Sequence, residues 1–263
     1  MEATRKMMQN TSRKQFLFAL RQMVLRGIKR RYARSYLGIV WSVLNPLMMM
    51  AVMSLIFTAI FKREIENYPI YFLTGQILWH FFSASTNSAM GALVDNKGLL
   101  MKVKLPKQIF VLARVLTEFT NLGYTCIAYV FMLIVFQVKP SLYMLLFPVI
   151  VFLFALFTTG ISYILSILYV HFADIQHLYS VFMRLLMYMT ALFYPVDSVA
   201  PALKRVIEMN PTYAFIYCAR ECVVYGRCPE FNVWLQIILW AVGMFAVGYF
   251  VFKKNENTVM QKV

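Results

Sequence analysis

The sequence predicts an all-α membrane protein with six transmembrane helices, an N-terminal amphipathic interfacial helix, and two short re-entrant outer helices between spans five and six. The chain of 263 residues is 61% hydrophobic and only 14% charged, whereas soluble domains are about 45–50% apolar and about 25% charged. Long apolar segments recur along it, and about 20 such residues cross the hydrocarbon core of a bilayer. Its 26 Lys and Arg outnumber its 11 Asp and Glu and gather beside those segments.

The first 36 residues form a basic segment with ten Lys or Arg and a single Glu. Its short apolar stretch at 16–20 is followed by Arg21 rather than by a small-residue cleavage site, so it is not a signal peptide. We expect an interfacial helix capped by Thr11 or Ser12, with a solvated basic tail as the alternative. The apolar face of this helix is Phe16, Leu17, Leu20, Met23, Val24 and Ile28, and the basic face contains Lys14, Arg21, Lys29 and Arg30.

Six segments are expected to cross the membrane as helices. Four contain no Asp, Glu, Lys or Arg, whereas the third span contains Arg114 and Glu118 and the fifth contains Arg184. Ionisable residues are costly in lipid and are therefore candidates for function. In chain order the segments are 37–61, 68–94, 109–138, 140–170, 175–196 and 231–252.

The basic residues predict the orientation of the chain, because loops on the cytoplasmic side carry the excess of Lys and Arg. The loop at 95–108 has four Lys, and the tail after 252 has three. Six crossings place the N-terminus, the second and fourth loops and the C-terminus on that same side. We therefore expect a multi-pass protein of the cytoplasmic (inner) cell membrane with both termini cytoplasmic, and membrane lipids rather than nucleic acid as the partner of the basic excess.

The segment 197–230 is too polar for two further spans. Prolines divide it into short pieces of helical period, at 202–209 and 213–224. Backbone that enters the membrane without crossing it must pack against protein, so we expect these pieces to lean on the spans as an outer lid. The same segment holds Cys222 and Cys228, for which a disulfide and two reduced thiols both remain open.

Arg184 has two interpretations. In the first, Arg184 pairs with Glu118 and joins two helices, because the two residues lie at similar depths in the fifth and third spans. Arg114 lies one turn before Glu118. Alternatively, Arg184 faces a conduit and contacts an anionic group of a substrate, because the guanidinium binds phosphate oxygens in pairs.

Several motifs of catalysis are absent from the sequence. No Gly-Lys pair occurs, so this chain does not bind ATP in the P-loop manner, and any ATP is hydrolysed elsewhere. There is no His-Glu-x-x-His, no Cys-x-x-Cys, and no carboxylate cluster beside the three His. We expect no metal site and no catalytic residue on this chain.

Four stretches, in order along the chain, carry a family resemblance. They are RYARSYLGIVWSVLNPL at 31–47, GQILWHFF at 75–82, NKGLLMKVKLPK at 96–107, and FYP at 193–195 with NP at 210–211. Together they resemble the membrane (permease) subunits of type-2 ABC exporters, in the branch that exports polysaccharide, O-antigen and teichoic acid. The resemblance covers essentially the whole chain and identifies 1–263 as a single transmembrane domain, with a basic cytoplasmic or interfacial helix (1–36), a six-span bundle (37–252) and a cytoplasmic tail (253–263).

The resemblance implies a homodimer of this chain with two copies of a separate nucleotide-binding ABC ATPase, exporting a lipid-linked glycan through a channel at the dimer interface. This chain is then a transport subunit without a cofactor of its own, because ATP and Mg bind to the partner subunit. The first and fifth spans line the channel of the family, and aromatic faces there allow sugar rings to slide, although packing explains such residues as well. The expected channel residues are Trp41, Asn45, Arg184, Tyr188, Phe193 and Tyr194.

Two further surfaces are expected from the basic segments. A helix at 95–108 is expected to dock into the ATPase, although binding of lipid head groups is an alternative. The N-terminal basic helix is expected to gather the diphosphate of the substrate beside the channel entrance, or simply to anchor to lipid. The fourth loop reads HFADI where many members carry an Arg-Asp pair, so its coupling contact is reduced to one carboxylate. The coupling residues are Lys97, Leu99, Leu100, Lys102, Lys104 and Asp174, and the entry residues are Lys29, Arg30, Arg31 and Arg34.

Two other functions remain open at the level of sequence. One is a drug or lipid exporter of the same superfamily, which neighbouring genes would distinguish from a glycan exporter. The other is a membrane-embedded glycan-processing enzyme, which requires a catalytic carboxylate or His exposed to the membrane surface. Substitution of Asp95, Asp174 and Glu118 without loss of activity would exclude it.

Overall fold

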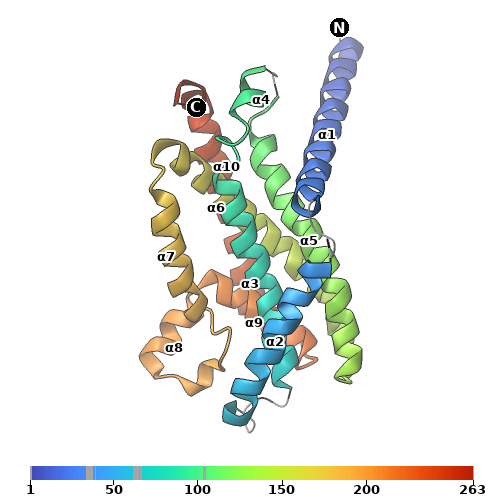
Figure 1. Cartoon of the computed structure of the whole chain (residues 1–263), viewed down its shortest axis with the longest axis vertical. Helices are drawn as coiled ribbons and strands as arrows, with labels where there is room; N and C mark the ends of the chain where they lie inside the picture. The colour runs from blue at the N-terminus through green and yellow to red at the C-terminus, as the bar shows by residue number, and fades with distance from the viewer. Residues whose placement is uncertain are drawn as a thin grey trace.

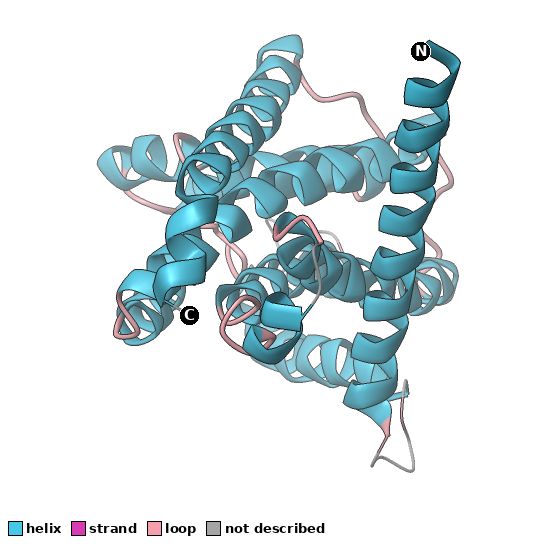
Figure 2. Cartoon of the chain, turned by 90° about the horizontal axis from the view of Figure 1, so that it is seen from above, coloured by secondary structure: helices cyan, strands magenta, loops and turns pink. Residues whose placement is uncertain are grey.

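The computed structural model describes the backbone of residues 2–33, 38, 40–61, 65, 67–102 and 105–262, and side chains within 14–33, 38, 40–57, 65, 67–102 and 105–256. Every regular element in these ranges is a helix (Figures 1 and 2). The order is α1 (Glu2–Tyr32), α2 (Val40–Phe61), α3 (Tyr68–Met90), α4 (Lys97–Lys102), α5 (Gln108–Val135), the 3-10 helix η1 (Leu142–Leu146), α6 (Phe147–His171), α7 (Ile175–Tyr188), the 3-10 helix η2 (Val196–Ser198), α8 (Pro201–Glu208), α9 (Pro211–Val223) and α10 (Phe231–Lys262).

Helix α3 is the centre of the bundle and contacts α2, α5, α6, α7 and α9. Most of its side chains are buried. Phe82 of α3, Phe154 and Phe157 of α6, and Phe215 of α9 form one aromatic cluster. Burial of these large rings joins α3, α6 and α9 into a common core.

Four helices of the described chain are long and apolar enough to cross a membrane: Val40–Phe57, Gln108–Val135, Leu142–His171 and Phe231–Glu256. They establish a multi-pass membrane protein and correspond to four of the six expected spans. Helix α3 is long enough, but its second half is rich in Ser, Thr and Asn. Helix α7 has 14 residues and is about 21 Å long, less than the hydrocarbon thickness of about 30 Å.

Three expected helix boundaries are wrong. The helix expected over 175–196 ends at Tyr188, and the following turn contains Ala191 at φ 46°. Helix α1 begins at Glu2, so Thr11 and Ser12 do not cap it. The helix expected over 95–108 is only α4, because Pro106 cannot continue a helix and α5 begins afresh at Gln108.

The two short helices expected between the last spans are present as α8 and α9. Proline occupies the first turn of each, where its missing N–H costs no hydrogen bond. The side chain of Asn210 caps α9 by accepting a hydrogen bond of 3.0 Å from the backbone N–H of Thr212.

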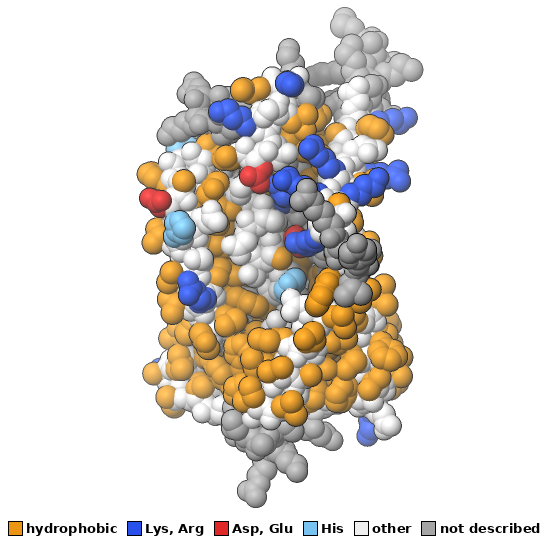
Figure 3. Space-filling model, in the orientation of Figure 1, with side chains coloured by type: hydrophobic (Ala, Val, Ile, Leu, Met, Phe, Trp, Pro, Cys, Tyr) orange, Lys and Arg blue, Asp and Glu red, His pale blue; other side chains and the backbone are white. Residues whose placement is uncertain are grey.

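The molecule has two unlike ends. Both chain ends, α4 and the α6–α7 connection lie at one end, and α8 lies at the other (Figure 1). On the face shown in Figure 3, apolar side chains cover the half that contains α8, and Lys and Arg gather toward the half with α4 and the N-terminal helix.

Candidate functional site

Glu118 is the buried charge at the junction of α1, α2 and α5, and its carboxylate is 4% exposed. The Arg31 guanidinium lies 2.6 Å from it, and the Asn121 amide donates a second hydrogen bond of 3.0 Å. The hydroxyl of Tyr32 then hydrogen-bonds to the Asn121 carbonyl oxygen at 2.8 Å and to the Ser42 hydroxyl at 3.2 Å. This network fastens the C-terminal end of α1 to the bundle.

The expected pair between Arg184 and Glu118 is therefore wrong. Arg184 is exposed on α7, where its Nε donates to the backbone oxygen of Ser180 at 3.4 Å. Arg114 lies one turn from Glu118 but pairs with Asp95 at 2.8 Å. Similar depth in the two spans suggested Arg184 as the partner of Glu118. The partner is instead Arg31, which the N-terminal helix α1 brings to the buried carboxylate.

Three of the four expected entry residues lie on α1. Lys29 and Arg30 are exposed, Arg31 is committed to Glu118 with 40% of its side chain exposed, and Arg34 lies outside the described residues. Arg30 also lines a crevice of about 80 Å³ between α1, α5 and the 91–96 turn. We call this the α1–α5 crevice; its charged lining is Arg26, Arg30, Asp95 and Arg114.

The expected channel residues fall into two groups. Trp41, which is 50% exposed, and Asn45 line an open hollow of about 490 Å³ on the outward face of α2. The second group lies at the far end of α7, where Phe193 is buried against Tyr188 with ring centroids 6.1 Å apart. Tyr194 donates its hydroxyl to the Tyr188 carbonyl oxygen at 2.6 Å.

The expected coupling residues that the structure describes lie on α4 and in the α6–α7 connection, at the end that carries the termini (Figure 1). Lys97, Lys102 and Asp174 are exposed, Leu99 is half-buried, and Lys104 lies outside the described residues. Leu100 is 6% exposed and packs into the core of this chain, so its side chain is not available as the coupling contact expected of it. Its neighbour Met101 is exposed instead.

Arg220 is a buried arginine of α9 that is 3% exposed and was not among the residues predicted to be functional. Its guanidinium lies 3.6 Å from the centre of the Tyr71 ring and donates to the Tyr71 hydroxyl at 2.8 Å. It also donates to the backbone oxygens of Tyr71, Ala191 and Leu192 at 3.2, 3.0 and 2.9 Å. The signal was available, because Arg220 and Glu221 are adjacent charges in an otherwise uncharged helix.

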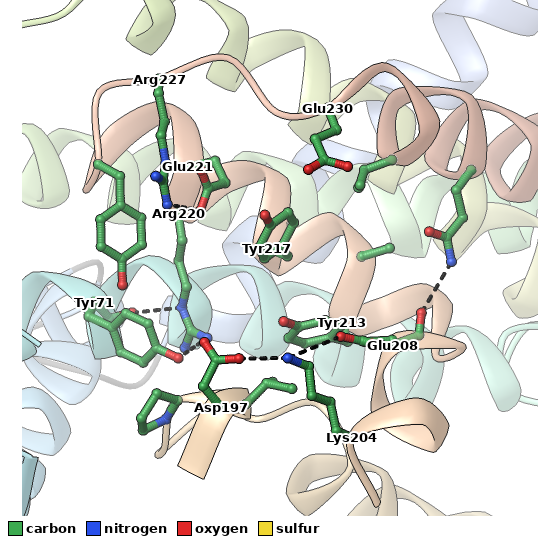
Figure 4. Close-up of a pocket in the computed structure, with 16 residues that line it drawn as sticks. Tyr71, Asp197, Lys204, Glu208, Tyr213, Tyr217, Arg220, Glu221, Arg227 and Glu230 are labelled. Atoms are coloured by element: carbon green, nitrogen blue, oxygen red, sulfur yellow. Dashed lines mark hydrogen bonds and ion pairs between the residues drawn. The ribbon is translucent and has the colours of Figure 1, made fainter. Parts of the chain in front are cut away.

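A polar cavity of about 440 Å³ lies beside Arg220, and we call it the α8–α9 pocket (Figure 4). Two ion pairs organise its rim: Lys204 with Asp197 at 2.7 Å, and Arg227 with Glu221 at 2.5 Å. The hydrogen bond that Lys204 donates to the Asp197 carboxylate raises the pKa of Lys204. The lining is Tyr71, Pro195, Val196, Asp197, Lys204, Glu208, Tyr213, Ala214, Tyr217, Arg220, Glu221, Tyr225, Arg227, Glu230, Val233 and Gln236.

Comparison with known families decides the class of this protein. The family described as ABC-2 type transporter matches residues 19–224, which is most of the chain. The chain belongs to this family.

Curated relatives of this ABC-2 transporter chain match it over nearly its full length. The O-antigen export system permease protein RfbA of Myxococcus xanthus is 28% identical over 95% of this chain and 96% of its own. The RfbA protein of Klebsiella pneumoniae is 28% identical over 91% of this chain and 93% of its own. The polysialic acid transport protein KpsM of Escherichia coli is 23% identical over 90% and 93%, respectively.

As an ABC-2 transporter subunit, the chain is a transport protein and not an enzyme. This excludes the alternative function of a membrane-embedded glycan-processing enzyme. Within the described residues, no three His, Cys, Asp or Glu side chains are grouped as a metal would require.

Proposed function

We propose that this chain is the membrane subunit of an ATP-driven exporter that moves a lipid-linked polysaccharide, such as an O-antigen, a capsule-like glycan or teichoic acid, across the cytoplasmic membrane. The observation that carries the proposal is the near-complete match to the O-antigen export permease of Myxococcus xanthus. The match to the polysialic acid transport protein KpsM supports polysaccharide as the general substrate class.

The working assembly is two copies of this chain with two copies of a separate ABC ATPase, which binds ATP and Mg. Helix α2 supports self-association, because it exposes an apolar face that includes Met48, Val52 and Leu55. The face of α7 that includes Leu178, Phe182 and Leu185 is also exposed. Apolar faces of this extent mark lipid or partner contacts, and the channel forms where these faces of the two copies meet.

Six crossings with both termini in the cytoplasm complete this proposal. Helix α3 crosses although its second half is polar, because it is shielded by five other helices. Helix α7 crosses together with the 189–195 turn, and α8 and α9 enter the outer leaflet without crossing. The end with the termini carries the coupling surface of Lys97, Leu99, Met101, Lys102 and Asp174.

The α1–α5 crevice supports capture of the diphosphate of the lipid carrier. Arg26, Arg30 and Arg114 bring three guanidinium groups to one small cavity, and Asp95 offsets one of them. Guanidinium groups bind phosphate oxygens through paired, charge-assisted hydrogen bonds. Lys29 extends the basic surface beside the crevice.

Arg184 is the substrate contact within the channel. Its guanidinium is exposed on α7 and, within the described chain, has no carboxylate partner. It therefore remains available to a phosphate group as the lipid-linked glycan passes.

The test is purification of this chain with the ATPase encoded beside it, followed by ATPase assay with and without a lipid-linked oligosaccharide. The proposal expects stimulation by the oligosaccharide in the unaltered complex. Arg184→Gln should fold with an unchanged melting temperature and lose the stimulation, because no buried partner is stranded. Lys139→Gln, an exposed cation outside the channel, is the matched control and should keep it. Stimulation by hydrophobic drugs but not by lipid-linked oligosaccharide would establish the drug exporter instead.

A further inference from the structure

We propose that the α8–α9 pocket is a binding site for a short neutral stretch of glycan, one or two uncharged pyranose units in length. The source of the sugar rests on the proposed function, whereas the class of ligand is argued from the pocket itself. The cavity of about 440 Å³ lies within the range of about 300–1,000 Å³ that is typical of small-molecule sites.

Tyrosine rings provide the stacking surface of the pocket. Tyr213 and Tyr217 lie one turn apart on α9, with ring centroids 5.9 Å apart, and both line the cavity. Figure 4 shows these two rings in the middle of the lining, with Glu221 and Arg227 to one side and Glu230 to the other. The negative face of an aromatic ring attracts the weakly positive C–H groups of a pyranose.

The polar lining offers donors and acceptors together, as sugar hydroxyls require. The Glu230 carboxylate is exposed in the pocket and, among the described residues, has no ion-pair partner, so its oxygens can accept from hydroxyl groups. Burial, and then the Glu221 carboxylate, raise the pKa of the Tyr217 hydroxyl, which therefore remains a protonated donor at neutral pH. Each sugar hydroxyl both donates and accepts, so a lining of one kind alone would leave it half satisfied.

The charges of the pocket favour a neutral ligand over an anionic one. Four carboxylates, of Asp197, Glu208, Glu221 and Glu230, face three cations, of Lys204, Arg220 and Arg227. Each of these cations already has partners: Lys204 binds Asp197, Arg227 binds Glu221, and Arg220 donates to backbone oxygens and Tyr71. A uronate or a phosphate would find no unpaired cation and would meet an excess carboxylate.

The position of the pocket gives this binding a role. It lies beside α8, at the end of the bundle opposite α4 (Figure 1), which is the exit side in the proposed topology. A weak site there would hold sugar units that have left the channel and oppose their return.

The experiment measures binding of methyl glycosides of glucose, galactose and mannose to the purified complex in nanodiscs, by saturation-transfer NMR. We expect saturable binding of at least one neutral glycoside and no saturable binding of methyl glucuronide. Tyr217→Ala and Glu230→Gln should each weaken binding by about tenfold, the equivalent of one charge-assisted hydrogen bond or stacking contact. Tyr143→Ala and Glu256→Gln change the same residue types outside the pocket and should leave the affinity unchanged.

The outcomes separate this inference from the proposed function. Absence of neutral glycoside binding, equal binding of the glucuronide, or unchanged affinity in both pocket variants with a normal elution volume would each overturn the inference. Surface polysaccharide is measured in parallel in cells that lack the chain. If cells that lack the chain lose surface polysaccharide but the purified complex binds no glycoside, only the inference about the pocket is refuted. If the purified complex binds glycoside but these cells keep normal surface polysaccharide, only the proposed function is refuted.

Discussion

Arg220 joins three parts of the chain that are far apart in sequence. From α9 it binds Tyr71 of α3 and the backbone oxygens of Ala191 and Leu192 in the turn after α7. Ala191 has φ 46°, a conformation that L residues adopt at a cost. The planar fork of the guanidinium places separate donors at each of these oxygens, which a single ammonium group cannot do.

Arg220→Lys should therefore destabilise the protein by about 2–4 kcal/mol, because at least one buried carbonyl oxygen loses its donor and the contact with the Tyr71 ring is lost. Arg227→Lys is the matched control, since Arg227 is largely exposed and lysine keeps a positive charge beside the buried Glu221 carboxylate, so we expect a loss of only about 0–1 kcal/mol. Thermal unfolding in one detergent compares the two. Equal melting temperatures for both variants would contradict the joining role of Arg220.

The Arg31–Glu118 pair predicts an asymmetry between its two partners. Arg31→Gln strands a carboxylate that is 4% exposed, at a cost of about 3–5 kcal/mol. Glu118→Gln leaves an arginine that still reaches water, so we expect a cost of about 1 kcal/mol. In the double variant no charge is stranded, and it should be more stable than Arg31→Gln alone.

Unfolding of the three variants in detergent measures this order. The Arg184→Gln variant belongs in the same series as a control, because Arg184 lies on α7 and does not pair with Glu118. A larger loss of stability in Glu118→Gln than in Arg31→Gln would refute the asymmetry.

At the scale of the helices, α6 and α10 approach so closely that only glycine fits between them. A Cβ atom on Gly160 would lie 2.7 Å from the backbone nitrogen of Phe245, and a Cβ on Gly248 would overlap the backbone of Gly160. Small residues that permit close backbone contact are a general device for packing membrane helices, where apolar burial gives little drive.

Gly160→Ala and Gly248→Ala should force α6 and α10 apart and destabilise the bundle by about 1–3 kcal/mol, the range for an overpacked contact. Gly243 lies on the same α10 and has open space around its Cα. Gly243→Ala should therefore leave stability unchanged or raise it by up to about 1 kcal/mol, because alanine favours helix. Unfolding temperature and yield of folded protein check the series, and tolerance of alanine at Gly160 would exclude the close crossing.

Local features of this fold could be predicted from the sequence, whereas contacts between residues far apart in the chain could not. Composition identified membrane helices, and the prolines of the segment 197–230 placed two short helices at 202–209 and 213–224, within two residues of the starts of α8 and α9, because these signals are local. The partner of Glu118 was missed, because Arg31 is 87 positions away and depth in the membrane does not define which helices are neighbours. The end of α7 was also missed, because the turn at Ala191 is bonded to Arg220, which is 29 positions away, and no local pattern encodes that contact.

For the whole molecule, the central question is how many times the chain crosses the membrane. The four helices identified by composition include neither α3 nor α7. If only those four crossed, no crossing would separate the α6–α7 turn from the loop before α10, and both would lie on one side. Six crossings place a span between them, so the two turns lie on opposite sides.

Cys228 makes this difference measurable, because it is exposed in the loop before α10 while Cys218 and Cys222 are buried and Cys126 is half-buried. A membrane-impermeant maleimide applied to right-side-out vesicles should label the native chain at Cys228, and Cys228→Ser should abolish the labelling. With Cys228→Ser as background, Asp174→Cys places a thiol in the exposed α6–α7 turn. We expect this thiol to react only after the vesicles are permeabilised. Labelling of both positions from the outside would support four crossings and remove Asp174 from the proposed coupling surface.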